Sequence, residues 1–293
     1  MPHDPGAPCL FPDADVLQSR LRALWPGTVV EVVPTTASTN DDLLQAARQG
    51  GLDAPLLRVA EHQTAGRGRR SRTWVSRRGD SLTFSLAVPL APQDWSGLSL
   101  AVGVALAEAL EPATGGQPRI GLKWPNDLWL RDASEPRGGR KLGGVLIETV
   151  ASAGLRVAVV GVGLNARRQA RDGSDSGLDS GLDSGLAGLE ELHPEASPAQ
   201  ALALAAPALL GALARFEREG FGAFAPAYAA RDLLAGREVT AGPVPDASGQ
   251  DTLRGVAQGV DAFGRLLLRD ADGRVQPVLA GEVSVRTAEA VAA

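Results

Sequence analysis

The chain has 293 residues, of which 44% are hydrophobic and 22% charged, and its formal net charge is −5. This composition excludes a disordered chain and gives enough length for one large domain and a small one. The acidic balance argues against a general nucleic-acid binder, and the single cysteine, Cys9, excludes a disulfide framework and a thiolate metal site.

Residues 1–28 are predicted to be a variable lead-in with one short helix over 16–25. They are too few for a helix-turn-helix DNA-binding domain. They also lack the basic and apolar regions of a signal peptide, so a cytoplasmic location is expected. No apolar stretch is clean enough to span a membrane, since the most apolar one, 199–214, contains Pro207.

A larger domain is expected over 29–235, where helical and strand-like apolar patterns alternate. The predicted elements follow in chain order: a strand over 29–33, a helix over 41–49 capped by Ser38 or Thr39, strands over 56–61 and 81–88, a helix over 96–110, strands over 120–124, 143–150 and 156–161, and helices over 198–219 and 221–234, the first kinked or restarted at Pro207. From residue 237 short strands are separated by Gly, Pro and Asp, which predicts a small SH3-like β-barrel over 237–288. The predicted fold class is α+β, a mixed sheet packed with helices and followed by that barrel.

A period-four S-G-L-D repeat runs through 173–188, within a low-complexity segment over 172–188. The repeat offers no apolar face to bury. It therefore predicts a flexible surface insertion in the larger domain.

Lysine and asparagine are scarce in this chain. Of 29 basic residues only Lys123 and Lys141 are lysine, and the only asparagines are Asn40, Asn126 and Asn165. A lysine kept where arginine is otherwise used suggests a place that needs a compact ammonium rather than a planar fork. All five fall in short motifs at loop edges: S-T-N (38–40), K-W-P-N-D (123–127), R-K-L-G-G (140–144) and G-V-G-L-N (161–165).

The loop over 66–78, G-R-G-R-R-S-R-T-W-V-S-R-R, carries six arginines and no acid. Gly66 and Gly68 let its backbone turn sharply and approach a ligand closely. Arginine forks suit bidentate contact with phosphate or carboxylate oxygens, so the loop is a candidate anion-binding loop. A solvated basic loop or an arginine patch for RNA are the alternatives.

No familiar phosphate-binding loop is present in the sequence. There is no G-x-x-x-x-G-K-[ST], and the G-V-G at 161–163 is followed by N-A-R-R rather than by a third glycine that opens a helix. The G-V-G alone is more typical of a tight turn than of a dinucleotide site.

Two further motifs place polar groups where strands end or begin. In K-W-P-N-D, Pro125 stiffens the chain and fixes the direction of Asn126 and Asp127. Asp127 is a candidate Mg²⁺ or ribose contact, with a turn residue that satisfies nearby backbone as the alternative. In R-K-L-G-G, Lys141 precedes two glycines, an arrangement that brings an ammonium and bare backbone to one ligand.

Together these motifs resemble those of the biotin–protein ligases. S-T-N-D, A-E-H-Q-T-A-G-R-G-R-R-S-R-T-W, K-W-P-N-D-L, R-K-L-G-G-V-L-I-E and V-G-V-G-L-N occur in family order and at family-like spacing. The resemblance is close over 29–165 and looser to the closing barrel, where G-E-V-S-V-R (281–286) also looks like the family's end. It implies that biotin and ATP, with Mg²⁺, form biotinyl-5′-adenylate and pyrophosphate. Biotin is then transferred to a lysine of a biotin carboxyl carrier domain.

The resemblance also implies roles for individual residues. Lys141 and Arg67 are the implied catalytic residues, with Arg67 nearest the biotin carboxylate and the phosphate. The biotin-binding set is Ser38, Thr39, Asn40, Gln63, Arg67, Gly68, Arg69 and Lys141. The set for ATP and the adenylate is Arg70, Trp74, Lys123, Asn126, Asp127, Asn165 and Arg286, with Asp127 also the implied Mg²⁺ ligand.

Three departures from the family pattern are visible. Ser71 replaces the last glycine of the family's G-R-G-R-x-G-R loop. After Asn165 the sequence gives no residues that can be assigned to cover the adenine. The winged-helix domain of the bifunctional ligase–repressors has no counterpart in residues 1–28, which implies a ligase without an operator-binding role.

Two other functions remain as alternatives. The lipoate ligases and octanoyltransferases share the implied fold and transfer an acyl group to a lysine. A non-catalytic biotin-binding regulator would instead be expected to have a damaged Lys141 or arginine loop, and neither is seen. The sequence leaves the oligomeric state open, with a homodimer paired through sheet edges as one arrangement.

Overall fold

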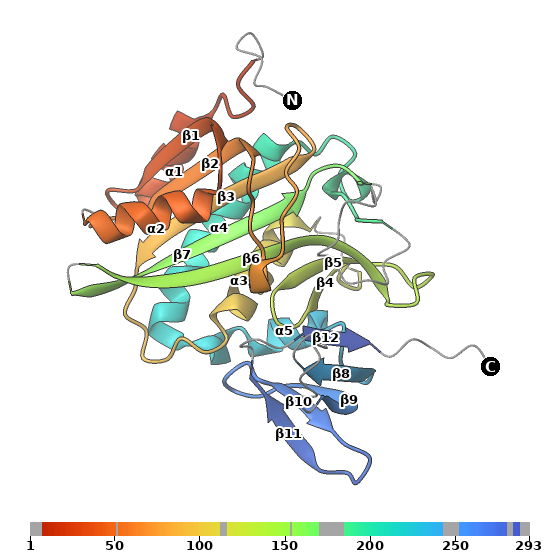
Figure 1. Ribbon diagram of the computed structural model, residues 1–293. Coiled ribbons are helices and arrows are strands. Elements are labelled where there is room, and N and C mark those ends of the chain that lie inside the picture. The colour runs from red at the N-terminus through yellow and green to blue at the C-terminus, as the bar shows by residue number, and fades with distance from the viewer. Residues whose placement is uncertain are drawn as a thin grey trace.

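The computed structural model describes residues 8–50, 52–111, 116–152, 154–169, 185–242, 252–279 and 284–287 (Figure 1). Its larger part is built on a seven-stranded mixed sheet in the order β1-β2-β3-β7-β6-β5-β4. Only β1 and β2 pair in parallel, and every other neighbouring pair is antiparallel. The strands are β1 (Val29–Thr36), β2 (Leu56–Gln63), β3 (Ser81–Pro89), β4 (Ile120–Lys123), β5 (Asp127–Arg131), β6 (Gly139–Ser152) and β7 (Leu155–Asn165).

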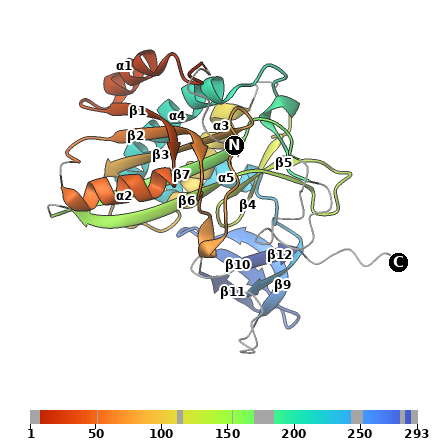
Figure 2. The ribbon, with the colours of Figure 1, turned by 45° about the horizontal axis from the view of Figure 1, so that its top comes forward.

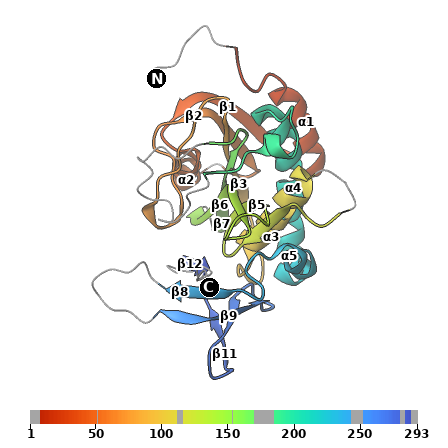
Figure 3. The same ribbon diagram turned by 90° about the vertical axis from the view of Figure 1, so that its right-hand side faces the viewer.

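Helices cover the two faces of this sheet unequally (Figure 3). Four helices pack on one face: α1 (Ala14–Leu24), α3 (Leu98–Leu110), α4 (Pro198–Glu219) and α5 (Ala225–Arg231). Among the helices of the described ranges, α2 (Thr39–Gln49) alone lies on the opposite face, against β2, β3, β6 and β7. Alternation along β7 matches this arrangement, because Val160 and Val162 enter the large core while Val157 and Val159 pack beneath α2.

Helix α4 is continuous through Pro207, so it does not restart there as one of the two predicted alternatives had it. A proline in a helix leaves the carbonyl four residues earlier without its usual donor. Here the Ala203 carbonyl accepts a hydrogen bond from Arg20 Nη1 of α1 at 3.3 Å. By length and composition α4 could span a membrane, but half of its most apolar window is buried inside the protein, as in the core helix of a soluble protein.

A second sheet follows, with five antiparallel strands in the order β11-β10-β9-β8-β12 (Figure 2). Its strands are β8 (Glu238–Gly242), β9 (Leu253–Val260), β10 (Leu266–Arg269), β11 (Val275–Val278) and β12 (Ser284–Thr287). The buried indole of Trp124 donates a hydrogen bond to the Gly264 carbonyl at 2.9 Å and joins the two parts. A mixed sheet packed with helices and a small antiparallel β-domain confirm the predicted fold class.

The structure differs from the predicted elements in three places. Strands β5 and β11 were not predicted, although β4, which is equally short, was. The helix expected over 221–234 is shorter, a 3₁₀ turn (Phe221–Ala223) followed by α5. It stops because Asp232 leaves the helix, bridges Leu122 of β4 and accepts the Leu234 N–H through Oδ1.

The S-G-L-D repeat lies largely outside the described residues, which resume at Gly185. The expectation that the whole segment has nothing to bury is wrong for its last residues. Leu186 and Ala187 are buried, and the Ala187 N–H donates to the Lys141 carbonyl at 2.8 Å. The end of the segment is therefore part of the packed domain.

Candidate active site

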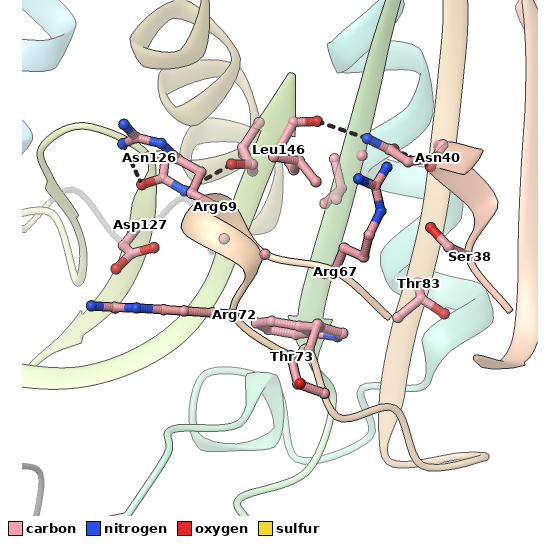
Figure 4. Close-up of a pocket in the computed structure, with 18 of the residues that line it drawn as sticks. Ser38, Asn40, Arg67, Arg69, Arg72, Thr73, Thr83, Asn126, Asp127 and Leu146 are labelled. Carbon is pink, nitrogen blue, oxygen red and sulfur yellow. Dashed lines mark hydrogen bonds between the residues drawn. The ribbon is translucent and has the colours of Figure 1, made fainter. Parts of the chain in front are cut away.

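A cavity lies on the α2 face of the large sheet, beneath the arginine loop (Figure 4). Its walls come from the start of α2, the loop over 66–74, β3, the turn between β4 and β5, β6 and β7, and it also includes Val285 of β12. The structure brings most of the predicted site residues together here: Ser38, Thr39, Asn40, Gln63, Arg67, Gly68, Arg69, Arg70, Trp74, Lys123, Asn126, Asp127 and Lys141.

The N-terminus of α2 forms one end of the cavity. Ser38 caps the helix, accepting the Asp41 N–H through its side chain, so the capping residue predicted as Ser38 or Thr39 is Ser38. The next two residues, Thr39 and Asn40, are buried and face the sheet. Gln63, at the end of β2, accepts the Thr39 N–H at 2.8 Å through Oε1, and the same oxygen lies 3.0 Å from the Thr39 hydroxyl. This end of the cavity is thus a small wall of neutral hydrogen-bonding groups.

Two glycines of β7 give this wall and the loop room to approach the sheet. A Cβ on Gly161 would overlap the side chain of Asn40, and a Cβ on Gly163 would overlap the indole ring of Trp74. Both glycines belong to the G-V-G that was interpreted as a tight turn. They lie instead within a regular strand, where their lack of a side chain lets Asn40 and Trp74 lie against the backbone.

The opposite end of the cavity carries Lys141 and Asp127. The Nζ of Lys141 lies 2.8 Å from Oδ1 of Asp127 and 6.0 Å from the centroid of the Trp74 ring. Both charged side chains are mostly buried. The indole N–H of Trp74 is also buried and has no hydrogen-bond partner within the described part of the chain. This end therefore combines a cation, a carboxylate and an unused donor.

The arginine loop crosses between the two ends. Arg67 Nη2 contacts Asp41 Oδ1 at 2.5 Å and Glu148 Oε2 at 2.8 Å, at the α2 end. Arg69 Nη1 donates to Asn126 Oδ1 at 3.3 Å, at the Asp127 end, as Figure 4 shows. Burial lowers the pKa of Arg69, although the charge of Asp127 opposes that shift. The loop's own countercharge is thus supplied by carboxylates of the sheet and α2.

The loop geometry bears on the role expected for Arg67. It was expected nearest the carboxylate and phosphate, yet its guanidinium lies beside Asp41 and Glu148 rather than beside Lys141. Arg69, two residues later, donates to Asn126 beside Asp127, whose charge opposes the lowering of the Arg69 pKa. Between them Gly68 is extended, and Arg70 adopts a left-handed conformation with φ of 60°, which turns the loop tip.

Asn165 is not among the described residues that line the cavity, and the position of the Arg286 side chain lies outside the described part of the structure. Asn165 is buried at the end of β7, where its Nδ2 donates to the Ala187 carbonyl at 3.1 Å and its Oδ1 accepts from Gln169 at 3.4 Å. The Asn165 amide therefore holds the segment around Ala187, which follows the S-G-L-D repeat. Arg286 lies in β12, paired through its backbone with Thr240, and its side chain is outside the described part of the structure.

Several cavity residues were missed from the sequence. Ser85 and Thr83 face α2 from β3, and Ser85 carried no signal beyond strand alternation. Glu148 ends the quoted R-K-L-G-G-V-L-I-E motif but received no role, although it contacts both Arg67 and Asn40. Trp124 and Trp129, interpreted as core or lip residues, are both buried in the interior.

Comparisons with known proteins agree with this geometry. Residues 32–165 match the model of the "Biotin/lipoate A/B protein ligase family", and residues 236–286 match the "Biotin protein ligase C terminal domain". The bifunctional ligase/repressor BirA of Escherichia coli is 34% identical over 90% of this chain and 76% of its own length. The biotin–[acetyl-CoA-carboxylase] ligase of Mycobacterium tuberculosis is 36% identical over 87% of this chain and 88% of its own.

A solved structure extends the agreement to three dimensions. The biotin protein ligase of Aquifex aeolicus, in complex with biotin and ATP, superposes with a TM-score of 0.66 at 26% identity, covering 88% of this chain and 99% of that one. The fold and the two matched domains agree on one family. The relatives also align with this chain over most of its length. This chain therefore belongs to the biotin/lipoate A/B protein ligase family, and within it to the biotin protein ligases.

Proposed function

We propose that this ligase joins biotin to ATP in the cavity beneath the arginine loop and then passes biotin to a lysine of a biotin carboxyl carrier domain. The observation that carries the proposal is the two-ended cavity, with neutral hydrogen-bonding groups at α2 and cations around Lys141. Biotin has the same division, since its ring carries a neutral urea and its side chain ends in a carboxylate.

In this proposal the ring of biotin binds at the α2 end. Ser38, Thr39, Asn40 and Gln63 supply hydrogen bonds there, and Arg67 with Gly68 closes over it. The polar groups of this end are buried and already hydrogen-bonded to each other, so they are held in fixed directions.

The carboxylate and the α-phosphate meet at the other end, near Lys141 and Arg69. The biotin carboxylate oxygen attacks the α-phosphorus, the bond to the bridging oxygen breaks, and pyrophosphate leaves. Negative charge grows on the phosphoryl oxygens, so fixed cations that face them lower the barrier. Lys141 is the proposed catalytic residue. Arg69, rather than Arg67, is the proposed loop cation beside it, because Arg69 lies on the Asp127 side.

The nucleotide is proposed to lie over Trp74, Arg70, Lys123 and Asn126, with Arg286 of the C-terminal β-domain reaching towards it. Trp74 offers a ring face and an unused N–H. Val285 lines the cavity, so β12 of the C-terminal β-domain lies beside the proposed nucleotide site. The proposed domains are a catalytic domain over 29–235 and the barrel over 237–288.

Magnesium belongs to the proposal as a companion of ATP. Among the described residues there is no group of three or more His, Cys, Asp or Glu side chains that could hold a metal ion. Mg²⁺ commonly binds through one or two carboxylates together with substrate phosphates, and a single carboxylate, Asp127, fits that pattern. The ion would neutralise phosphate charge, while Lys141 and Arg69 orient the reacting oxygens.

The second step needs an acceptor amine. The ε-amine of a carrier lysine attacks the carbonyl of the mixed anhydride, AMP leaves, and the amine loses a proton as the amide forms. The loop over 66–78 is proposed to shield the adenylate from water until the carrier arrives. A cytoplasmic location follows from the need for ATP, and a homodimer through sheet edges remains part of the proposal.

Pyrophosphate release from Mg·ATP tests the adenylating step, with biotin, lipoate or octanoate supplied separately. We expect release with biotin only, and its loss in Lys141→Ala. Release with lipoate or octanoate instead would move the activity to the sister ligases. Biotin binding without pyrophosphate release would leave a biotin-binding regulator.

A further inference from the structure

Glu148, on β6, contacts both the arginine loop and the wall at the start of α2. Its Oε2 lies 2.8 Å from Arg67 Nη2 and accepts the Asn40 Nδ2 hydrogen bond at 2.9 Å. Asp41 also contacts Arg67 Nη2, at 2.5 Å, but it is more exposed than Glu148. Two carboxylates therefore hold one arginine, and of these two Glu148 also accepts a hydrogen bond from Asn40.

The amide of Asn40 can take only one orientation. Its Nδ2 also donates to the Leu146 carbonyl at 3.3 Å, and a carbonyl can only accept. The Oδ1 of Asn40 must then be the atom that faces Ser85, whose hydroxyl donates to it at 2.6 Å. Ser85 is fully buried, and its single proton is used in this bond.

The proton of Thr39 is fixed in turn. Its hydroxyl lies 2.7 Å from Ser85 Oγ, and because Ser85 donates to Asn40, Thr39 is the donor in this contact. The other neighbour of that hydroxyl, Gln63 Oε1 at 3.0 Å, can only accept. The lone pairs of Thr39 Oγ1 are thus left to accept from a ligand. An N–H of a cyclic urea supplies such a donor, and a dithiolane ring does not.

We propose that Glu148 is a positioning residue that joins Arg67 of the loop to this wall through Asn40. Hydrogen bonds run without a break from Gln63 through Thr39, Ser85 and Asn40 to Glu148 and Arg67. A displacement of these hydrogen-bonding groups therefore also displaces Arg67. When their hydrogen bonds leave Thr39 Oγ1 free to accept a ring N–H, Arg67 is held by Glu148 and the loop lies over the cavity. This inference rests on the proposed function, in which the ring of biotin binds at the α2 end.

Three variants separate the contacts of Glu148. Glu148→Ala removes its bonds to both Arg67 and Asn40. Glu148→Gln keeps a carbonyl that can accept from Asn40 but removes the charge that faces Arg67. Asp41→Asn is the matched control, because it also removes one charge that faces Arg67, while Asn40 Nδ2 donates to Leu146 and Glu148 within the described residues.

Ser85→Ala is the fourth variant and tests transmission along the hydrogen bonds. Within the described residues the hydrogen bonds of Ser85 go to Thr39 and Asn40. A purely local role of Ser85 would leave the loop unchanged. Transmission through Asn40 and Glu148 would loosen the loop as well.

Two measurements on the full chain give the readouts: the biotin dissociation constant by calorimetry, and the rate of trypsin cleavage after the loop arginines by mass spectrometry. We expect Glu148→Ala to raise the dissociation constant about tenfold, since it leaves a buried donor of Asn40 unpaired. Asp41→Asn and Glu148→Gln are expected to speed loop cleavage with a smaller change in biotin affinity. Ser85→Ala is expected to weaken biotin binding and also to speed loop cleavage.

Equal effects of Glu148→Ala and Asp41→Asn on biotin affinity would overturn the inference. So would a Ser85→Ala protein that cleaves at the wild-type rate. Thermal unfolding of each variant identifies one that fails to fold. If Glu148→Ala fails to fold, the biotin affinities and loop cleavage rates of Glu148→Gln and Asp41→Asn test the inference instead. A wild-type protein that binds no biotin would count against the proposed function itself, before any variant is compared.

Discussion

The Nζ of Lys141 lies 2.8 Å from Oδ1 of Asp127, on the neighbouring strand of the sheet. The pair is mostly buried at the edge of the cavity, and Gly144 leaves room beside it. A flexible lysine stem would otherwise sample many positions. Asp127 therefore fixes the position of the Lys141 ammonium.

Replacing Lys141 should remove most of the adenylating activity. Lys141→Ala is expected to lower kcat for pyrophosphate release by about 10²–10³, the usual effect of losing one group that stabilises developing charge. Asp127→Asn should cost less, because the ammonium stays but loses its fixed position. Arg218→Ala, on the exposed side of α4, is the control. A Lys141→Ala enzyme with wild-type kcat would contradict the assignment.

Adding a methyl group to Gly163 of β7 should displace the Trp74 ring, which lies against it. The new Cβ would overlap the indole of Trp74, and such overpacking costs about 1–3 kcal/mol of unfolding free energy. We expect Gly163→Ala to lower both the urea midpoint and the affinity for ATP. Gly211→Ala in α4 is the matched change, since its Cβ would meet nothing, and it should stabilise the protein by up to about 1 kcal/mol. An unchanged midpoint for Gly163→Ala would show that Trp74 moves freely.

The segment before α1 should be held by a pH-dependent contact. Burial alone would raise the pKa of Glu61, but the Leu10 N–H and Arg78 together hold that pKa below its ordinary value. A carboxyl with a lowered folded-state pKa adds stability above its unfolded pKa, and this stability is lost as the pH falls through the folded value.

The comparison of Glu61→Gln with the wild type tests this contact. At pH 7 the variant should be less stable by about 1.5–3 kcal/mol, the range for hydrogen bonds to a charged group. The two unfolding free energies should converge as the pH falls through the lowered folded-state pKa of Glu61, below the ordinary range for a glutamate. Parallel curves across the whole pH range would rule out the contact as their cause.

Shortening the S-G-L-D segment should leave adenylation intact. Gln169 pairs with Leu186, and Ala187 is hydrogen-bonded to both Lys141 and Asn165. The residues that flank the S-G-L-D segment are therefore held by contacts outside it. Deleting residues 173–184 leaves four residues between Gln169 and Leu186, a length that hairpin turns commonly use. Pyrophosphate release with biotin is the assay, and a large loss of activity would assign the segment a role in catalysis.

The local parts of this structure could be predicted from the sequence. The Ser38 cap with the acidic first turn of α2, and the alternating strands of the large sheet, follow from patterns within a few residues. Lys141 and Asp127 could be singled out because lysine is rare and because each belongs to a recognisable motif. Each of these features depends on residues within a few positions of one another in the sequence.

The long-range parts could not be predicted. Ser85 matters because β3 lies beneath the start of α2, and no property of its own segment indicates that neighbour. Asn165 was expected at the nucleotide because it ends a motif, but its amide is used by Ala187, which follows the S-G-L-D repeat. Strand β5 depends on pairing with β4 and β6 rather than on its own short pattern.

The position of Val285 in the cavity wall has a consequence for synthesis of the protein. The wall runs from Ser38 near one end of α2 to Val285 of β12, which pairs with β8. Contacts so far apart in sequence form late. The chain loses the entropy of closing a long loop before these contacts contribute any stabilisation. A chain still emerging from the ribosome can therefore fold the large sheet but not complete the cavity. Adenylate chemistry should begin only once β12 has been released and has paired.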